Sequence, residues 1–146
     1  MGRLVTLLLA VLIVSCGSVG TPGPAQTASP TASPTASPVP TPVVSAKGLI
    51  TLKSPTVNAR LTSPVTISGD ASVFEAALAW RITDTGGRVI AEGFTTASLG
   101  APGRGTYSIN ATYTVPSETL AFIEVFSRSA KDGSIDEIVR IPVTLR

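Results

Sequence analysis

The chain has 146 residues and a formal net charge of +2, and 43% of its residues are hydrophobic whereas only 14% are charged. The charged fraction is well below the roughly 25% of an average soluble chain. Because the sequence has no histidine and one cysteine, it excludes histidine-dependent triads, histidine-ligated zinc and internal disulfides.

The charges and the aromatic residues are unevenly distributed along the chain. Arg3 and Lys47 are the only charged residues among the first 48, whereas all nine acidic and all seven aromatic residues lie between Asp70 and Glu137. This contrast predicts three segments: residues 1–15, residues 16–48 and a folded domain over residues 49–146.

The first segment has the features of a secretory signal peptide. Arg3 is followed by an apolar run over residues 4–14, interrupted only by Thr6, and then by Ser15-Cys16-Gly17. The run is about half as long as the roughly 20 residues of a membrane-spanning helix, and it ends in small residues that suit a peptidase. We therefore predict export rather than a transmembrane helix.

The single cysteine lies where this apolar run ends. Ile13-Val14-Ser15-Cys16 resembles the bacterial lipobox, in which an aliphatic residue, a variable residue and a small residue precede the cysteine. The resemblance implies transfer of a diacylglyceryl group to the Cys16 thiol, cleavage before Cys16 and acylation of the new amine, with fatty acids such as palmitate. Two or three acyl chains anchor a protein stably. We expect a bacterial lipoprotein whose domain lies on the extracytoplasmic side of the cell membrane.

Two other interpretations of the N-terminus are open. The segment could be an ordinary signal peptide that happens to contain a cysteine. Met1-Gly2 followed by Thr6 also fits the template for N-myristoylation, although an export-type apolar run follows it.

The second segment, residues 16–48, is rich in Pro, Thr, Ser and Ala. Seven of the twelve prolines lie between Pro22 and Pro42, and three copies of Thr-Ala-Ser-Pro run from Thr27 to Pro38. Each proline fixes its own φ and favours extended backbone in the residue before it. We predict a disordered, semi-extended linker that spans on the order of 90 Å at most, at about 3.1 Å per residue.

In the third segment, apolar and polar residues alternate as in β-strands. Over residues 74–83 the alternation predicts that Phe74, Ala76, Leu78, Trp80 and Ile82 face one side, before the turn at residues 84–87. Six further strands are predicted at residues 49–53, 65–68, 88–95, 106–115, 120–128 and 138–145. Seven short strands predict an all-β fold, an immunoglobulin-like β-sandwich with Trp80 in its core.

Three motifs of this domain carry a family resemblance. They are Ser63-Pro64-Val65-Thr66-Ile67-Ser68-Gly69, Val73-Phe74-Glu75-Ala76 and Ser129-Ala130-Lys131-Asp132-Gly133-Ser134. In this order, they resemble the Gmad-type immunoglobulin-like domain of bacterial spore germination proteins, over residues 49–145. The resemblance implies a β-sandwich module of exported bacterial proteins, often beside a germination-type domain, with no established catalysis.

Other candidate sites have simpler explanations. Asp132, Asp136 and Glu137 supply only a fragment of a calcium loop, and an Asp-Gly turn accounts for the motif, so we expect no metal and no cofactor. The glycines between Gly100 and Gly105 precede a predicted strand and not a helix, which disfavours a phosphate site. Cleavage before Cys16 leaves a net charge of +1 without a basic run, so no nucleic-acid partner is expected.

The strand over residues 120–128 is apolar on both faces. Ile123 and Val125 point one way and Phe122 and Phe126 the other, on either side of Glu124. If one set fills the core, the other is covered by loops of the domain or forms an exposed patch for a partner. Under the second alternative, a flat binding face is formed by Phe122, Glu124, Phe126, Ala77 and Ala79.

These observations predict a non-enzymatic, lipid-anchored envelope protein that presents a binding or assembly module. The absence of histidine and of a Gly-x-Ser-x-Gly motif disfavours a hydrolase. The partner is an envelope protein, in a germination-like or other cell-surface complex, or a cell-wall glycan. An accessory role beside an envelope hydrolase or transporter is a further alternative.

Overall fold

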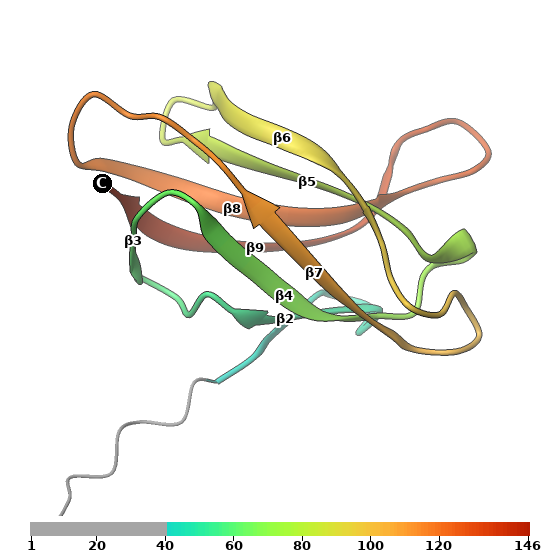
Figure 1. The fold of residues 1–146 in the computed structure, drawn as a ribbon. Helices are drawn as coiled ribbons and strands as arrows, with labels where there is room; N and C mark the ends of the chain where they lie inside the picture. Colours follow the sequence, from blue (N-terminus) through green and yellow to red (C-terminus); the bar gives the residue numbers. More distant parts are fainter. Residues whose placement is uncertain (1–40) are drawn as a thin grey trace, which may run out of the picture. The chain divides into compact units, whose positions relative to one another are not determined.

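The computed structural model describes residues 41–146; Cys16, the predicted signal peptide and all but the end of the predicted linker lie outside them. The described residues form two β-sheets that pack face to face around one hydrophobic core (Figure 1). This arrangement confirms the predicted all-β sandwich. Within residues 41–146, no helix has the length and apolar character needed to span a membrane.

Both sheets are antiparallel except where β3 pairs with β9. The first sheet has the order β1-β2-β4-β7 and the second has the order β3-β9-β8-β5-β6. The elements are β1 (Val43–Val44), β2 (Ile50–Ser54), β3 (Arg60–Leu61), β4 (Val65–Ala71), a 3-10 turn η1 (Phe74–Ala76), β5 (Ala77–Asp84), β6 (Val89–Thr96), β7 (Gly105–Ala111), β8 (Thr119–Arg128) and β9 (Ile135–Leu145).

All seven predicted strands are present, with shifted ends. The structure adds the two-residue strands β1 and β3 at sheet edges. Strand β1 pairs with β2, although its residues belong to the segment predicted as linker. Such short strands carry too few residues to show an alternation in the sequence.

The predicted inward position of Phe74 is wrong. Phe74 lies in η1 and is 66% exposed, whereas Leu78, Trp80 and Ile82 on β5 are buried as predicted. The reason is local: Glu75 has a φ of 51° and Ala76 a φ of 57°, both in the left-handed region. Two such residues interrupt the extended backbone and with it the alternation of side chains.

The core consists of the inward rows of both sheets. Ile50, Ile67, Ile82, Ile123 and Ile141 come from five different strands and are fully buried. Trp80 packs against the backbone of Gly93 on the neighbouring strand, where a Cβ atom would lie 2.9 Å from the indole ring. The ring therefore occupies the space that a larger residue at position 93 would fill.

Gly69 permits a close approach inside the first sheet. A Cβ atom at this position would lie 1.9 Å from the carbonyl oxygen of Thr51 on β2 and 2.7 Å from the Tyr107 hydroxyl. The Tyr107 hydroxyl donates a hydrogen bond to the same carbonyl oxygen, at 3.1 Å. Gly69 is therefore required for the contact between β2, β4 and β7.

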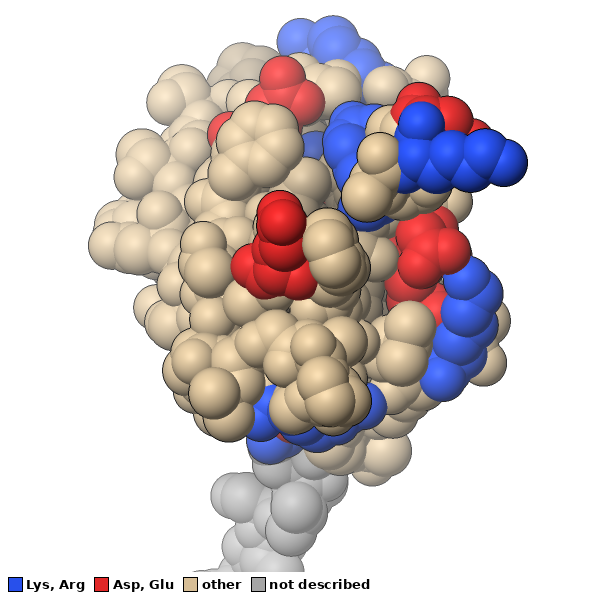
Figure 2. Space-filling view, turned by 90° about the vertical axis from the view of Figure 1, so that its right-hand side faces the viewer, with Lys and Arg blue, Asp and Glu red and all other residues tan. Residues whose placement is uncertain are grey.

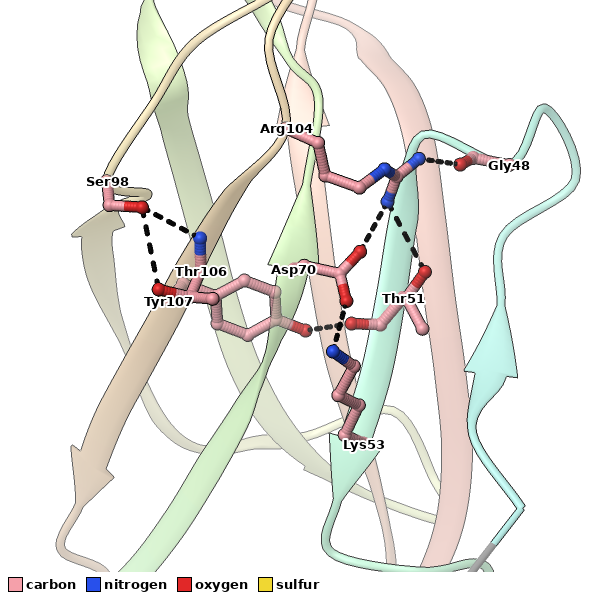
Figure 3. Close-up of polar contacts among 8 residues, drawn as sticks. All are labelled: Gly48, Thr51, Lys53, Asp70, Ser98, Arg104, Thr106 and Tyr107. Atoms are coloured by element: carbon pink, nitrogen blue, oxygen red, sulfur yellow. Dashed lines mark hydrogen bonds and ion pairs between the residues drawn. The ribbon is translucent and has the colours of Figure 1, made fainter.

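Next to this contact, one carboxylate links three segments on the outer face of the first sheet (Figure 3). Asp70 on β4 forms 2.6 Å ion pairs with Lys53 on β2 and with Arg104 in the loop before β7. Arg104 also donates to the carbonyl oxygen of Gly48. Burial raises the pKa of Asp70, but the hydrogen bonds from Lys53 and Arg104 outweigh this effect and hold the pKa below its usual value of 3.8.

We predict that Asp70→Asn weakens the pH dependence of stability. A carboxyl whose pKa is lower in the folded state stabilises the fold above its unfolded-state pKa of about 4, and this contribution is lost as the pH falls through the folded-state pKa. The variant lacks this contribution, and its free energy of unfolding at pH 7 should be about 1–2 kcal/mol lower. Urea unfolding between pH 7 and pH 2 tests this; equal acid slopes in both proteins would contradict the prediction.

Candidate functional site

The predicted binding face lies on the outer surface of the second sheet. Ile123 and Val125 of β8 are fully buried in the core. The alternation of β8 and β5 therefore directs the other row outward, and it contains all five predicted residues: Phe122, Glu124, Phe126, Ala77 and Ala79. Ala77 is exposed and Phe122 half-buried, whereas Ala79, Glu124 and Phe126 are buried.

Glu124 is buried because two arginines of neighbouring strands hold its carboxylate. Arg81 on β5 donates through Nε to Oε2, and Arg140 on β9 pairs through Nε with Oε1 at 3.2 Å. Both arginines are the direct cross-strand partners of Glu124. Arg81 also lies opposite Glu92 of β6, so that acidic and basic residues alternate across four strands.

The same arginines cover the aromatic rings of the face. The Arg140 guanidinium lies 3.7 Å from the ring centroid of Phe122. Arg81 and Arg128 each lie 5.2 Å from the ring centroid of Phe126. Cation–π contacts of this kind are worth about 0.5–1 kcal/mol each at exposed sites. The outward rings of β8, Phe122 and Phe126, are therefore covered by arginine side chains of β5, β8 and β9.

A groove remains open at one end of this face, over β5. The small side chains of Ala77 and Ala79 form its floor, Phe94 of β6 lies on one side, and Phe126 and Arg128 of β8 lie on the other. We call these five residues the β5 groove. Its section between Ala77 and Phe94 has a volume of about 150 Å³, the size of a cavity that holds one benzene molecule.

The β5 groove contains three of the five predicted residues, namely Ala77, Ala79 and Phe126. Phe122 and Glu124 lie further along β8 and do not line it. The sequence reasoning missed Phe94 and Arg128. Phe94 is paired with Ala79, which in turn is paired with Phe126. The sequence does show that Phe94 is an aromatic residue at an outward position of the predicted strand 88–95. It does not show which strand lies beside this one, and so it does not place Phe94 next to Ala79.

Phe94 is the most exposed large hydrophobic residue of the described chain, at 83%. Scattered exposed apolar residues are normal, whereas an apolar patch bordered by polar groups indicates an interaction surface. Phe94 belongs to such a patch because it lines the β5 groove beside alanine side chains and because the charged groups of Glu92 and Arg128 lie next to it. This surface is the strongest candidate site in residues 41–146.

Asp132, Asp136 and Glu137, the acidic residues of the calcium-like motif, contact groups of the domain itself. Asp132 accepts hydrogen bonds from the backbone N–H and the hydroxyl of Ser134. Asp136 pairs with Lys47 at 2.7 Å, and the Glu137 carboxylate accepts from the backbone N–H of Lys47. In the part of the chain that the structure describes, no group of three or more acidic or cysteine side chains could hold a metal ion.

A second exposed apolar pair lies at the end of the sandwich formed by η1 and the loop between β6 and β7. Phe74 is 66% and Leu99 58% exposed. The glycine-rich segment from Gly100 serves loop packing here, since a Cβ atom at Gly100 would lie 2.9 Å from the backbone nitrogen of Ala76. Figure 2 looks onto this end and shows basic and acidic residues intermixed without a patch of one sign.

Comparison with known proteins places this domain in a family. The fold defines an immunoglobulin-like β-sandwich module. The family described as the immunoglobulin-like domain of bacterial spore germination matches residues 49–134. The chain belongs to this family, which confirms the resemblance found in the sequence motifs.

Two further comparisons add little about function. Among solved structures, the chain is similar to CopC from Methylosinus trichosporium OB3b, with 19% sequence identity and a TM-score of 0.38. The similarity covers 63% of this chain and 86% of the CopC chain. The comparison with curated proteins gave no match.

We predict that the two arginines paired with Glu124, Arg81 and Arg140, contribute unequally to the stability of the fold. In Arg81→Met the buried carboxylate keeps only the half-exposed Arg140, so the free energy of unfolding should fall by about 2 kcal/mol. Arg140→Met should lower it by about 1 kcal/mol, because this arginine is more exposed. Arg88→Met, which removes an exposed pair with Asp84, is the control and should change it by less than about 0.5 kcal/mol. Urea unfolding measures all three; equal effects would contradict the prediction.

Proposed function

We propose that this protein is a non-catalytic, lipid-anchored module of the bacterial cell envelope that binds a protein partner through the β5 groove. The observation that carries the proposal is the exposed ring of Phe94, which forms one side of this groove. An exposed aromatic residue next to a hollow of one side chain's size has the form of the aromatic anchors and pockets found in protein interfaces.

The chemistry of the charged residues supports a non-catalytic role. An acid–base catalyst needs a titratable group that faces a site open to substrate. Here Glu124 is covered by two arginines, Asp70 by a lysine and an arginine, and Asp136 is paired with Lys47. These carboxylates hold strands and loops together, which is a structural use. Glu92 does border the β5 groove, but among the described residues that line the groove there is no second carboxylate to act with it as an acid–base pair.

The sequence supports the anchor. Cys16 ends the apolar run in the context Ile13-Val14-Ser15-Cys16, and it is the only cysteine of the chain. The proline-rich residues that follow it would separate the domain from the membrane surface, since proline-rich linkers act as semi-rigid spacers.

We predict that the mature protein begins at Cys16 and carries acyl chains on this residue. Mass spectrometry of the N-terminal peptide from membranes should detect a diacylglyceryl thioether on Cys16, and the intact protein should partition into the detergent phase. Cys16→Ser should lack this mass. An N-terminal peptide that begins elsewhere, or an unmodified Cys16 thiol, would contradict the anchor without affecting the proposal for the groove.

The composition of the groove favours a protein over a cell-wall glycan as partner. Its floor and sides are mostly hydrocarbon, with one guanidinium from Arg128 and one carboxylate from Glu92 at its border. A glycan presents many hydroxyl groups, which need hydrogen-bonding partners when they are buried. A protein segment with an apolar side chain meets the groove without this cost.

We predict that capture of the partner depends on Phe94. The full chain is purified from gently solubilised native membranes, and a stoichiometric protein should accompany the wild type. Phe94→Ser should reduce the amount of this protein at least about tenfold, because burial of the ring in the interface contributes about 1.5–3 kcal/mol. Phe74→Ser is the matched control: it removes a second exposed phenylalanine outside the groove and should leave capture unchanged.

Two results would refute this proposal. One is equal loss of the partner in both phenylalanine variants. The other is retention of the purified wild-type chain on isolated wall polymer that Phe94→Ser abolishes, because the groove would then bind a glycan.

A further inference from the structure

The hollow of the β5 groove between Ala77 and Phe94 has Arg128 as its one charged residue among the described residues. The rest of its lining consists of Ala77, Leu78, Ala79 and Phe94. Its volume of about 150 Å³ suits a large apolar side chain. A ligand that fits this hollow therefore combines an apolar group with a group that pairs with a guanidinium.

The guanidinium of Arg128 is held in place but pairs with no carboxylate of residues 41–146. Its Nη1 donates to the Gly133 carbonyl oxygen at 2.9 Å, and the guanidinium lies 5.2 Å from the ring centroid of Phe126. An arginine has five N–H donors, so this hydrogen bond leaves most of them unused. The arginines that do pair with a carboxylate are Arg60, Arg81, Arg88, Arg104 and Arg140. Arg128 therefore has donors for a carboxylate from outside the domain.

Glu92 borders the groove on the other side of Phe94, and its charge is offset there. In the strand register Glu92 lies opposite Arg81, Arg81 lies opposite Glu124, and Glu124 lies opposite Arg140. This row across four strands carries two negative and two positive charges. Arg128 lies outside the row, so its positive charge is the one that the face leaves uncompensated at the groove.

We propose that the β5 groove binds an extended segment of a partner protein in which an Asp or Glu side chain lies two residues from a large apolar side chain. The apolar side chain fills the hollow between Ala77 and Phe94, and the carboxylate pairs with the guanidinium of Arg128. The charge of the segment is thus complementary to the charge of the groove. The proposal rests on the proposed function, because it names the chemistry of the partner at the same site.

The spacing of the two side chains follows from the strand geometry. Ala77 and Ala79 lie two residues apart on the outer face of β5, which corresponds to about 6.6–7 Å along a strand. Phe94 and Phe126 lie opposite Ala79, and Arg128 is two residues further along β8, on the side of Ala77. An extended segment above β5 directs every second side chain to the sheet at the same spacing. One side chain therefore enters the hollow while the side chain two residues away reaches Arg128.

The groove favours an acidic side chain over the terminal carboxylate of a chain. Terminal carboxylates are captured by clusters of free backbone N–H groups. The backbone N–H groups of a sheet lie in the plane of the sheet and not toward its outer face, so the floor of the groove offers none. A guanidinium instead pairs with a side-chain carboxylate through two parallel hydrogen bonds.

The test is selection of random peptides displayed on phage, with the purified full chain in detergent micelles as the target. Peptides that bind the wild type and are lost with Phe94→Ser occupy the groove. These peptides should be enriched in Asp or Glu two residues from a large apolar residue. With Arg128→Glu as the target, the same position should be enriched in Lys or Arg, because the charge that selects it is reversed.

The strength of the ion pair is measured with two synthetic peptides of one selected sequence, with Glu or Gln at the acidic position. The Gln peptide should bind the wild type about three- to tenfold more weakly, because it loses the charge-assisted hydrogen bonds of a partly exposed pair. With Arg128→Gln, the two peptides should differ by less than about twofold, since the partner of the carboxylate is gone. Raising the salt concentration should narrow the difference on the wild type.

Lys131→Glu is the matched control for Arg128→Glu. Lys131 lies in the loop after β8, does not line the groove and forms no ion pair within residues 41–146. Both substitutions change the net charge by the same amount, so only Arg128→Glu should change the selected sequences. Circular dichroism and thermal unfolding check that each variant folds; Arg128 is exposed, so its replacement should not perturb the core.

The outcomes separate this inference from the proposed function. Peptides that depend on Phe94 but show no acidic preference, or keep that preference with Arg128→Glu, overturn the inference while the proposed function holds. An equal change with Lys131→Glu also overturns the inference, because the effect would then come from net charge and not from a contact in the groove. If no selected peptide depends on Phe94, both the inference and the proposed function fail.

Discussion

The outer face of the second sheet depends on the two ion pairs of the Glu124 carboxylate, with Arg81 on one neighbouring strand and Arg140 on the other. A buried carboxylate without partners would be strongly unfavourable, and Arg81 and Arg140 compensate its loss of hydration from the strands on either side. Held in this way, the guanidinium groups lie over the phenylalanine rings of β8. The middle of the face is thereby closed, and the β5 groove opens where β5 carries alanine.

This arrangement explains how a small sandwich keeps its central strand β8 apolar on both sides. The inward row fills the core, while the outward rings are covered by arginines whose charges remain near water. Arginine suits this task because its planar guanidinium pairs with a carboxylate and stacks on a ring at the same time. The first sheet uses a simpler device, in which Asp70 joins two strands and a loop (Figure 3).

Under the proposed function, the two parts of the chain have separate tasks. The N-terminal residues give the domain its place at the membrane, and the domain provides a rigid surface. The β5 groove lies on two adjacent strands and one edge strand, so its shape is set by the sheet and not by flexible loops. A site on regular elements is held more accurately than a site on loops.

Alternation along the chain by itself determined the fold class, the seven predicted strands and the side of the sheet to which Phe122, Glu124 and Phe126 belong. It could do so because the direction of a side chain on a strand is a local property. The order of three sequence motifs indicated the family. The alternation gave a wrong prediction at Phe74, where two residues with left-handed backbone, Glu75 and Ala76, interrupt the extended chain. Only the tertiary structure decided which strands are neighbours. The strand order brings Arg81 and Arg140 to Glu124, from positions up to 43 residues apart in the sequence. It also brings Phe94 to Ala79 and Phe126. Strand order depends on contacts summed over the whole core, so no local pattern could have shown that a groove opens beside Phe94.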